Sequence, residues 1–294
     1  MPDASRIDLL DPAEVARLGG IEIVAQGVVE GFLAGIHRSP FRGFSVEFTE
    51  HRAYQPGDEL RYLDWKILAR ADRLFVKQFE EETNLRAMIL VDVSRSMAWR
   101  GAPERLTKRA YADRLAAALA LILLRQRDAT GLITFDAAVR EVVPARVKAG
   151  QWTRLVRGLV RTADGQGTAA EAALVRVTSL LVRRGLVILV SDLLFDRALA
   201  LTALRYLRHR GHQVIVLHLM DPAEAVLAGP PEVRFRDPES AASVVVRPRE
   251  LARVYGETVR REIAAWRSAC RRHGIAYHHV LTDLPFGMAL RQLA

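Results

Sequence analysis

A short apolar segment leads directly into an aspartate and two serines, in the stretch Ala87-Met88-Ile89-Leu90-Val91-Asp92-Val93-Ser94-Arg95-Ser96. A continuous apolar run of this length is typical of a strand that is buried on both faces of a parallel sheet. The polar residues follow at the carboxyl end of that strand, which is where α/β sheets bind their ligands. The stretch therefore predicts an α/β fold with a site just beyond its first strand.

Apolar runs and helical patterns then alternate through the rest of the chain. Helices are predicted at residues 103–127, 151–162, 169–184, 197–209 and 250–273, and strands at 131–135, 186–190, 213–219 and 275–281. Residues 139–143 are a hairpin partner for the second strand, and residues 233–246 are an inserted hairpin or loop. This alternation predicts a doubly wound, mostly parallel sheet with helices on both faces over residues 87–294.

The first 86 residues follow a different pattern. Apolar spacing between Val15 and Phe32 predicts one or two amphipathic helices that are interrupted near Gly19-Gly20. Alternating residues at 44–48, a turn at 55–58 and a further run at 74–79 predict a small β-containing module. We therefore expect an N-terminal helical and β module over residues 1–86, followed by the α/β domain over residues 87–294.

The composition is that of a globular protein with a basic surface. Half of the 294 residues are hydrophobic, which is enough for a full core and excludes disordered and fibrous classes. Forty-three Lys and Arg residues against 34 Asp and Glu give a net charge of +9. The arginines are spread evenly instead of forming a basic arm, so nucleic-acid binding stays an alternative and is not the favoured interpretation.

Cysteine content and hydropathy bear on the compartment. The single cysteine, Cys270, cannot form an internal disulfide, which suits a reducing compartment. The longest uncharged apolar run, residues 115–124, is much shorter than the ~20 residues that a membrane-spanning helix needs. We expect a cytoplasmic protein without a membrane span.

Carboxylates and hydroxyls gather at the predicted site. Asp92 and Asp192 each follow an apolar strand, and Thr168 follows a glycine-containing loop at the start of a helix. With Ser94 and Ser96 they form a set of hard oxygen ligands, which suits Mg²⁺ or Mn²⁺ better than zinc. The alternative is that the two aspartates cap loops at strand ends and that the serines initiate the helix after them.

The same residues resemble a known motif. Asp92-Val93-Ser94-Arg95-Ser96 matches the DxSxS signature of the metal-ion-dependent adhesion site in von Willebrand factor A-like domains, with Thr168 and Asp192 in the places of the later threonine and aspartate. Upstream segments are similar to the bacterial family called domain of unknown function 58; they are His37-Arg38-Ser39, Glu47-Phe48, Tyr54-Gln55-Pro56-Gly57-Asp58, Arg61, Asp64-Trp65 and Val76-Lys77-Gln78-Phe79. The resemblance covers nearly the whole chain.

The resemblance implies a Rossmann-like von Willebrand A domain, a bound divalent cation and partnership with a MoxR-type AAA+ ATPase. An acidic side chain of the partner would complete the metal shell, because a dication held largely by neutral hydroxyls keeps unneutralised positive charge. Partner contacts are expected at Arg95, Tyr54, Asp58, Arg61, Asp64 and Trp65. A segment such as Tyr54 to Trp65 is more often explained by a tight turn with a packed aromatic ring than by a binding site, although Asp58, Arg61 and Asp64 could still form an ion-paired surface that recognises the partner.

Enzyme signatures are missing from the sequence. A phosphatase of the haloacid dehalogenase type needs a second acid two residues after the first, where this chain has Ser94. The chain also has no P-loop pattern and no His-Glu-x-x-His pair. We therefore expect a non-enzymatic, metal-dependent protein-interaction module, an adaptor or chaperone-like partner of the ATPase, with a nucleic-acid-associated protein or a metal-dependent hydrolase as alternatives.

Overall fold

The computed structural model describes residues 20–35, 47–55, 67, 74–80, 85–162, 170–236 and 242–293. The chain divides into two compact units, a smaller one over Phe41–Leu85 and a larger one that takes in helix α2 (Ile21–Gly35) and the chain from Arg86 onward. In the smaller unit, β1 (Glu47–Ala53) and β2 (Phe75–Glu80) form an antiparallel pair with a register shift between Phe48 and Glu50. This division differs from the expected one because α2 belongs to the larger unit. The buried residues of α2 pack against other helices of that unit.

A six-stranded sheet forms the centre of the larger unit, in the order β10-β7-β6-β3-β4-β5. All neighbouring pairs are parallel except β4 and β5, which are antiparallel. The strands are β3 (Arg86–Asp92), β4 (Ala129–Phe135), β5 (Val139–Arg146), β6 (Leu186–Ser191), β7 (Gln213–Met220) and β10 (Ala276–Leu281). The predicted mostly parallel sheet, with its hairpin partner at the edge, is confirmed.

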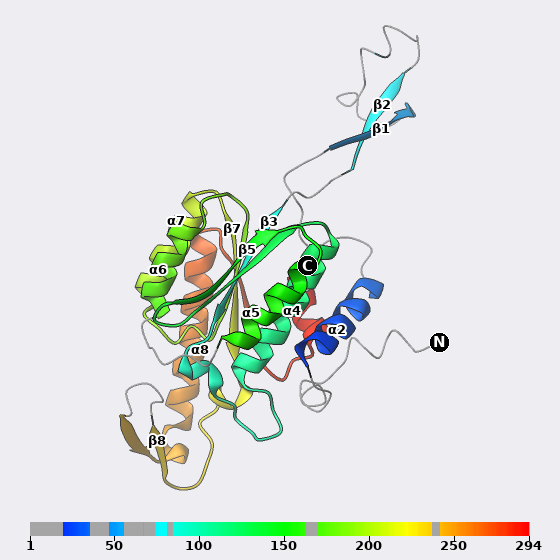
Figure 1. Cartoon of the computed structure of the whole chain (residues 1–294). Helices are drawn as coiled ribbons and strands as arrows, with labels where there is room; N and C mark the ends of the chain where they lie inside the picture. The colour runs from blue at the N-terminus through cyan, green and yellow to red at the C-terminus, as the bar shows by residue number, and fades with distance from the viewer. Residues whose placement is uncertain are drawn as a thin grey trace. The chain divides into compact units, whose positions relative to one another are not determined.

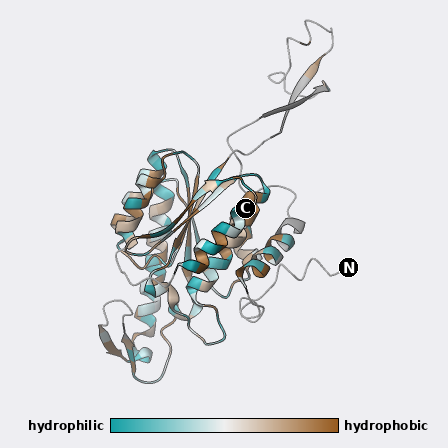
Figure 2. Ribbon diagram, in the orientation of Figure 1, coloured by the Kyte–Doolittle hydropathy of each residue, from teal (hydrophilic) through white to brown (hydrophobic). Residues whose placement is uncertain are grey.

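Helices cover both faces of this sheet (Figure 1). One face carries α6 (Ala170–Leu180), α7 (Arg197–His209) and α8 (Pro248–Arg272), whose apolar residues share one core cluster with β4, β6 and β7. The other carries α4 (Lys108–Arg125), α5 (Gln151–Arg161) and α9 (Phe286–Arg291). The arrangement is consistent with a Rossmann-like fold, and apolar residues concentrate in its strands (Figure 2).

Helix α4 is buried on nearly every side. Its apolar residues from Leu115 to Leu123 lie between the sheet and α2, which packs against it. Tyr111 stacks on Phe286 of α9 with ring centroids 4.6 Å apart, and its hydroxyl donates to the carbonyl oxygen of Leu284. Burial from two directions explains why the sequence of α4 is apolar almost all round instead of showing a single apolar stripe.

The start of α4 is basic. Thr107 caps the helix by accepting a hydrogen bond from the Ala110 amide at 3.0 Å, and the first two helical residues are Lys108 and Arg109. The first turn contains no acid. Because a helix N-terminus carries partial positive charge, two cations there need stabilisation from elsewhere.

Two smaller features complete the larger unit. The predicted inserted hairpin is present as β8 (Val233–Arg236) and β9 (Ser243–Val246), an antiparallel pair that precedes α8. Short 3₁₀ turns, η3 (Arg95–Ala98) and η4 (Pro222–Glu224), follow β3 and β7. Within the described ranges, no helix has both the length and the apolarity that a bilayer crossing requires.

Candidate metal centre

The strand order reverses at β3 and β6. From β3 the chain continues to β4 on one side, whereas β6 pairs with β3 on the other side, with Val91 opposite Val190. Asp92 is the last residue of β3, and Asp192 directly follows β6. The two carboxylates expected from the sequence therefore lie at the point where open α/β sheets bind ligands.

Asp92 is fully buried and is held by neutral donors. Its Oδ1 accepts from the Ser94 amide at 2.9 Å, and its Oδ2 accepts from the Ser191 hydroxyl at 2.6 Å. Burial first, and the nearby Asp192 second, raise the pKa of Asp92 to about 7. The ionised form of this carboxyl is therefore disfavoured until a positive charge comes close.

The two serines lie side by side next to Asp92. Their hydroxyls form a hydrogen bond with each other, with the Oγ atoms 3.1 Å apart, and both side chains are buried. Ser94 precedes η3 but makes no side-chain cap bond to it, so helix capping does not account for this hydroxyl. Adjacent ligands of an octahedral cation with metal–oxygen bonds of about 2.1 Å are about 3.0 Å apart. The spacing of the serine oxygens thus fits neighbouring positions on a magnesium ion.

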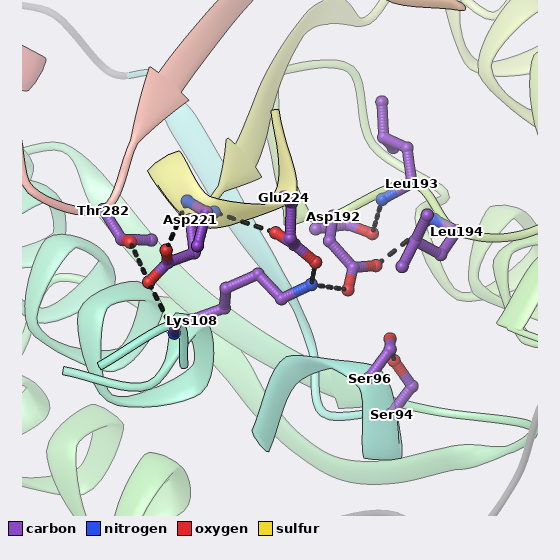
Figure 3. A network of polar contacts seen from close by, with 12 residues as sticks. Ser94, Ser96, Lys108, Asp192, Leu193, Leu194, Asp221, Glu224 and Thr282 are labelled. Carbon is purple, nitrogen blue, oxygen red and sulfur yellow. Dashed lines mark hydrogen bonds and ion pairs between the residues drawn. The ribbon is translucent and has the colours of Figure 1, made fainter. Parts of the chain in front are cut away.

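Asp192 has a cationic partner that the sequence did not indicate. Nζ of Lys108 donates to Asp192 Oδ2 at 2.8 Å and to Glu224 Oε1 at 2.5 Å, and Lys108 is only 1% exposed (Figure 3). Burial alone lowers the pKa of Lys108, but the two carboxylates outweigh burial and hold the pKa above its ordinary value. Lys108 is therefore a charged group inside the site, shared between two acids.

A third acid, Asp221, connects its own turn with the loop before α4 and with the end of β10. It is fully buried and accepts from the Arg105 guanidinium at 2.8 Å, the Gly101 amide at 3.1 Å and the Ala223 amide at 2.8 Å. Thr282, after β10, approaches the same carboxylate at 3.5 Å. A Cβ atom at Gly101 would lie 2.6 Å from Asp221 Oδ1, so only glycine fits there. Asp221 and Glu224 also form a capping box around η4.

Ser191 links the two strand ends. Its hydroxyl donates to Asp92 and accepts from the Leu193 amide at 2.9 Å. Leu193 is buried and has a φ of 55°, a left-handed conformation that is strained for a branched side chain. Asp192 lies between these two residues, so the hydroxyl bridge and the unusual backbone hold the main chain at Asp192 in place.

A groove of about 580 Å³ opens beside Asp192. It lies between the ends of β6 and β7 and helix α8, and it is lined mainly by apolar side chains, among them Leu194, Phe195, Ile263 and Trp266. Leu194 is 62% exposed. The candidate centre therefore borders an accessible apolar surface.

The remaining expected residues have different outcomes. Thr168, Asp58, Arg61, Asp64 and Trp65 lie outside the described residues. Tyr54 follows β1 in the smaller unit, where its amide donates to the Leu74 carbonyl at 3.0 Å, and Arg95 is exposed at the start of η3.

The donor set constrains which cation the centre can hold. In the part of the chain that the structure describes, no group of three or more His, Cys, Asp and Glu residues is arranged to hold a metal ion. A cation at this edge therefore depends on the hydroxyls of Ser94 and Ser96 together with the two aspartates. Such neutral and anionic oxygens fit a hard cation of the magnesium type.

A family model described as Protein of unknown function DUF58 matches residues 50–265. An uncharacterized protein of Mycobacterium tuberculosis (strain H37Rv) is 28% identical over 246 residues, which cover 81% of this chain and 75% of that protein. An uncharacterized protein of Mycobacterium bovis gives the same values of 28%, 81% and 75%.

Two solved structures from Bacteroides are similar to the chain. The conserved hypothetical protein BatB from Bacteroides thetaiotaomicron has 19% identity and a TM-score of 0.50, covering 71% of this chain and 96% of that one. An aerotolerance-related membrane protein from Bacteroides fragilis has 19% identity and a TM-score of 0.48, covering 71% and 97%. At this identity, the likeness to BatB concerns the fold alone.

Proposed function

The chain belongs to the DUF58 family, and on that premise we propose that it is a non-enzymatic protein-interaction module that works with a divalent cation. The cation would be Mg²⁺ or Mn²⁺, held by Asp92, Ser94, Ser96, Thr168 and Asp192. In finer terms, the larger unit would be a von Willebrand A-like domain with a metal-ion-dependent adhesion site. Its partner would be a MoxR-type AAA+ ATPase, whose client complex the module helps to assemble or mature.

One observation carries the proposal: Asp92 is a fully buried carboxylate whose described partners are an amide and a hydroxyl. An ionised carboxylate in such a place is costly unless a cation neutralises it. The serine hydroxyls beside it present lone pairs at a spacing that fits one ion. Asp92 would supply negative charge, and Ser94 and Ser96 would supply neutral oxygens.

The same donor set favours binding over catalysis. When bound, a dication held largely by neutral oxygens supplies residual positive charge and an open coordination position, to which a partner's Asp or Glu is attracted. The apolar groove beside Asp192 gives a partner a surface on which to pack next to that position. Asp192 and Glu224 are both engaged by Lys108, so neither is poised as a general acid or base.

The test compares Asp92→Asn with a matched control. Asp136 also follows a strand of the sheet and is buried, but it is ion-paired with Arg140 at 2.6 Å, so Asp136→Asn removes a buried carboxylate charge that already has its own cation. We expect Mg²⁺ at 100 times its dissociation constant to stabilise the natural chain and Asp136→Asn by about 2.7 kcal/mol, and Asp92→Asn far less. Thermal unfolding with Mg²⁺ and with chelator measures this.

The partner is tested with the same variants. We expect a MoxR-type ATPase to be recovered with the natural chain and with Asp136→Asn in Mg²⁺, and to be lost in chelator or with Asp92→Asn. Equal recovery with Asp92→Asn, together with an unchanged Mg²⁺ response, would overturn the proposal.

A further inference from the structure

Lys108 occupies an unusual position for a lysine. It is 1% exposed at the start of α4, and its ammonium lies between Asp192 and Glu224, which follow two different strands (Figure 3). We propose that this ammonium is a built-in competitor of the divalent cation: it holds Asp192 when no metal is bound, and it is retained by Glu224 when Asp192 turns to the metal. The inference rests on the proposed function, because it concerns the same centre.

Competition follows from the contacts of Asp192. Oδ2 is engaged by Lys108 at 2.8 Å, and Oδ1 accepts from the Leu194 amide at 3.2 Å. Each carboxylate oxygen keeps a further lone pair, so the competition is electrostatic: an ammonium that already neutralises Asp192 weakens the attraction of this carboxylate for a dication. The ammonium also repels a nearby dication, and that repulsion is strong in a buried site.

Glu224 is placed to keep the ammonium when Asp192 leaves it. Its Oε1 accepts from Lys108 at 2.5 Å, and its Oε2 accepts from the Asp221 amide at 2.8 Å within the capping box. Glu224 is thus fixed by its own turn and does not depend on Asp192. The Trp99 ring, whose centroid is 5.9 Å from Nζ, gives the ammonium a further favourable contact.

Two substitutions are expected to act in opposite directions. In Lys108→Met, the competitor is removed at similar side-chain length, so Mg²⁺ is expected to bind at least 10-fold more tightly. In Glu224→Gln, the second acceptor loses its charge and the ammonium is directed to Asp192, so Mg²⁺ is expected to bind several-fold more weakly. Titration calorimetry with Mg²⁺ alone measures both dissociation constants, and circular dichroism checks that each variant is folded.

Arg105→Met is the matched control. It removes one positive charge from the neighbouring Asp221 network and leaves the contact between Lys108 and Asp192 in place. We expect its dissociation constant for Mg²⁺ to stay within about twofold of the natural value. If Arg105→Met tightens binding as much as Lys108→Met does, the effect is one of net charge and competition is overturned.

The outcomes separate this inference from the proposed function. If the natural chain binds Mg²⁺ and Lys108→Met binds it no more tightly, competition is overturned and the proposed function stands. If Lys108→Met binds Mg²⁺ and the natural chain does not, competition is supported and the proposed function fails. If no variant binds Mg²⁺, both are overturned. Should Lys108→Met not fold, unchanged or tighter binding in Glu224→Gln overturns the inference by itself.

Discussion

Two groups of acids lie at the same edge of the sheet and differ in how their charge is balanced. Asp92 forms the hydroxyl side, where the donors are Ser94 and Ser191. Asp192, Asp221 and Glu224 form the ion-paired side, where Lys108 and Arg105 supply positive charge. The acids of the two sides therefore differ in charge balance although both sides are largely buried. Each acid of the ion-paired side contacts a cationic side chain, whereas Asp92 on the hydroxyl side has only neutral donors among the described residues and leaves a deficit of positive charge that a cation can fill.

The largest expected effect is on the ion-paired side. Asp221→Ala removes the acceptor for Arg105 and for two backbone amides, which leaves buried donors without a partner. We expect the free energy of unfolding to fall by about 4 kcal/mol, as for other broken buried pairs. Urea unfolding in chelator measures the loss. A loss below about 1 kcal/mol would show that the ion-paired side does not stabilise the fold, and the comparison would fail.

The second effect is a pH dependence that belongs to the hydroxyl side. The pKa of Asp92 is raised to about 7 from 3.8, so the folded state binds this proton more tightly than the unfolded state does. The contribution of Asp92 to stability is therefore greatest at low pH and is lost as pH rises through about 4 to 7. Without metal, we expect the free energy of unfolding to fall by about 3 kcal/mol between pH 5 and pH 8 because of this carboxyl, and we expect Asp92→Asn to lack that loss.

The pH dependence of Asp92 has to be measured as a difference between the natural chain and Asp92→Asn, because His218 titrates in an overlapping pH range. Burial, followed by the neighbouring His279, lowers the pKa of His218 to about 3 from 6.5, so its contribution to stability is present above about 6.5 and is lost as pH falls toward 3. The two groups oppose each other in the natural chain. The difference between the natural chain and Asp92→Asn, measured by urea unfolding at each pH in chelator, isolates Asp92. Parallel pH profiles for the two proteins would contradict the assignment.

The smallest effect concerns the bridge between the two sides. Ser191→Ala removes the hydroxyl that donates to Asp92 and accepts from the Leu193 amide. We expect a loss of about 1 kcal/mol, and an upward shift in the pH midpoint of Asp92, because this hydrogen bond lowers the pKa of Asp92. Ser179→Ala on the exposed face of α6 is the control and should cost less than about 0.5 kcal/mol. Equal losses in the two variants would argue against a bridging role.

The hydroxyl side and Asp192 were largely predictable from the sequence, because these residues directly follow the strands. Apolar runs before Asp92 and Asp192 identified buried parallel strands, and the polar residues after them had to meet at one edge of the sheet. Asp136 follows β4 in the same way, and its Oδ1 accepts from the Ala138 amide two residues later, as in a turn.

Apart from Asp192, the ion-paired side was not predictable from local pattern. Lys108 contacts Glu224 across 116 positions of sequence, and a lysine in the first turn of a helix is ordinarily solvated. Two weak signals were present. Lys108 is one of few lysines among 43 basic residues, and Asp221-Pro222-Ala223-Glu224 has the spacing of a capping box.

Helix α9, Phe286–Arg291, was also not predicted, because a helix of this length is too short to show a helical period in the sequence.

The basic start of α4 has a consequence for the order of folding. Arg109 pairs with Asp113 of its own helix at 2.9 Å, whereas the acids that contact Lys108 in the described part of the chain, Asp192 and Glu224, lie much later in the sequence. The helix interior can form early, whereas its first turn gains its counter-charges only after β6 and η4 have docked. Protection of the amides at the beginning of α4 from hydrogen exchange should therefore appear only when the segments after β6 and β7 have packed against this helix.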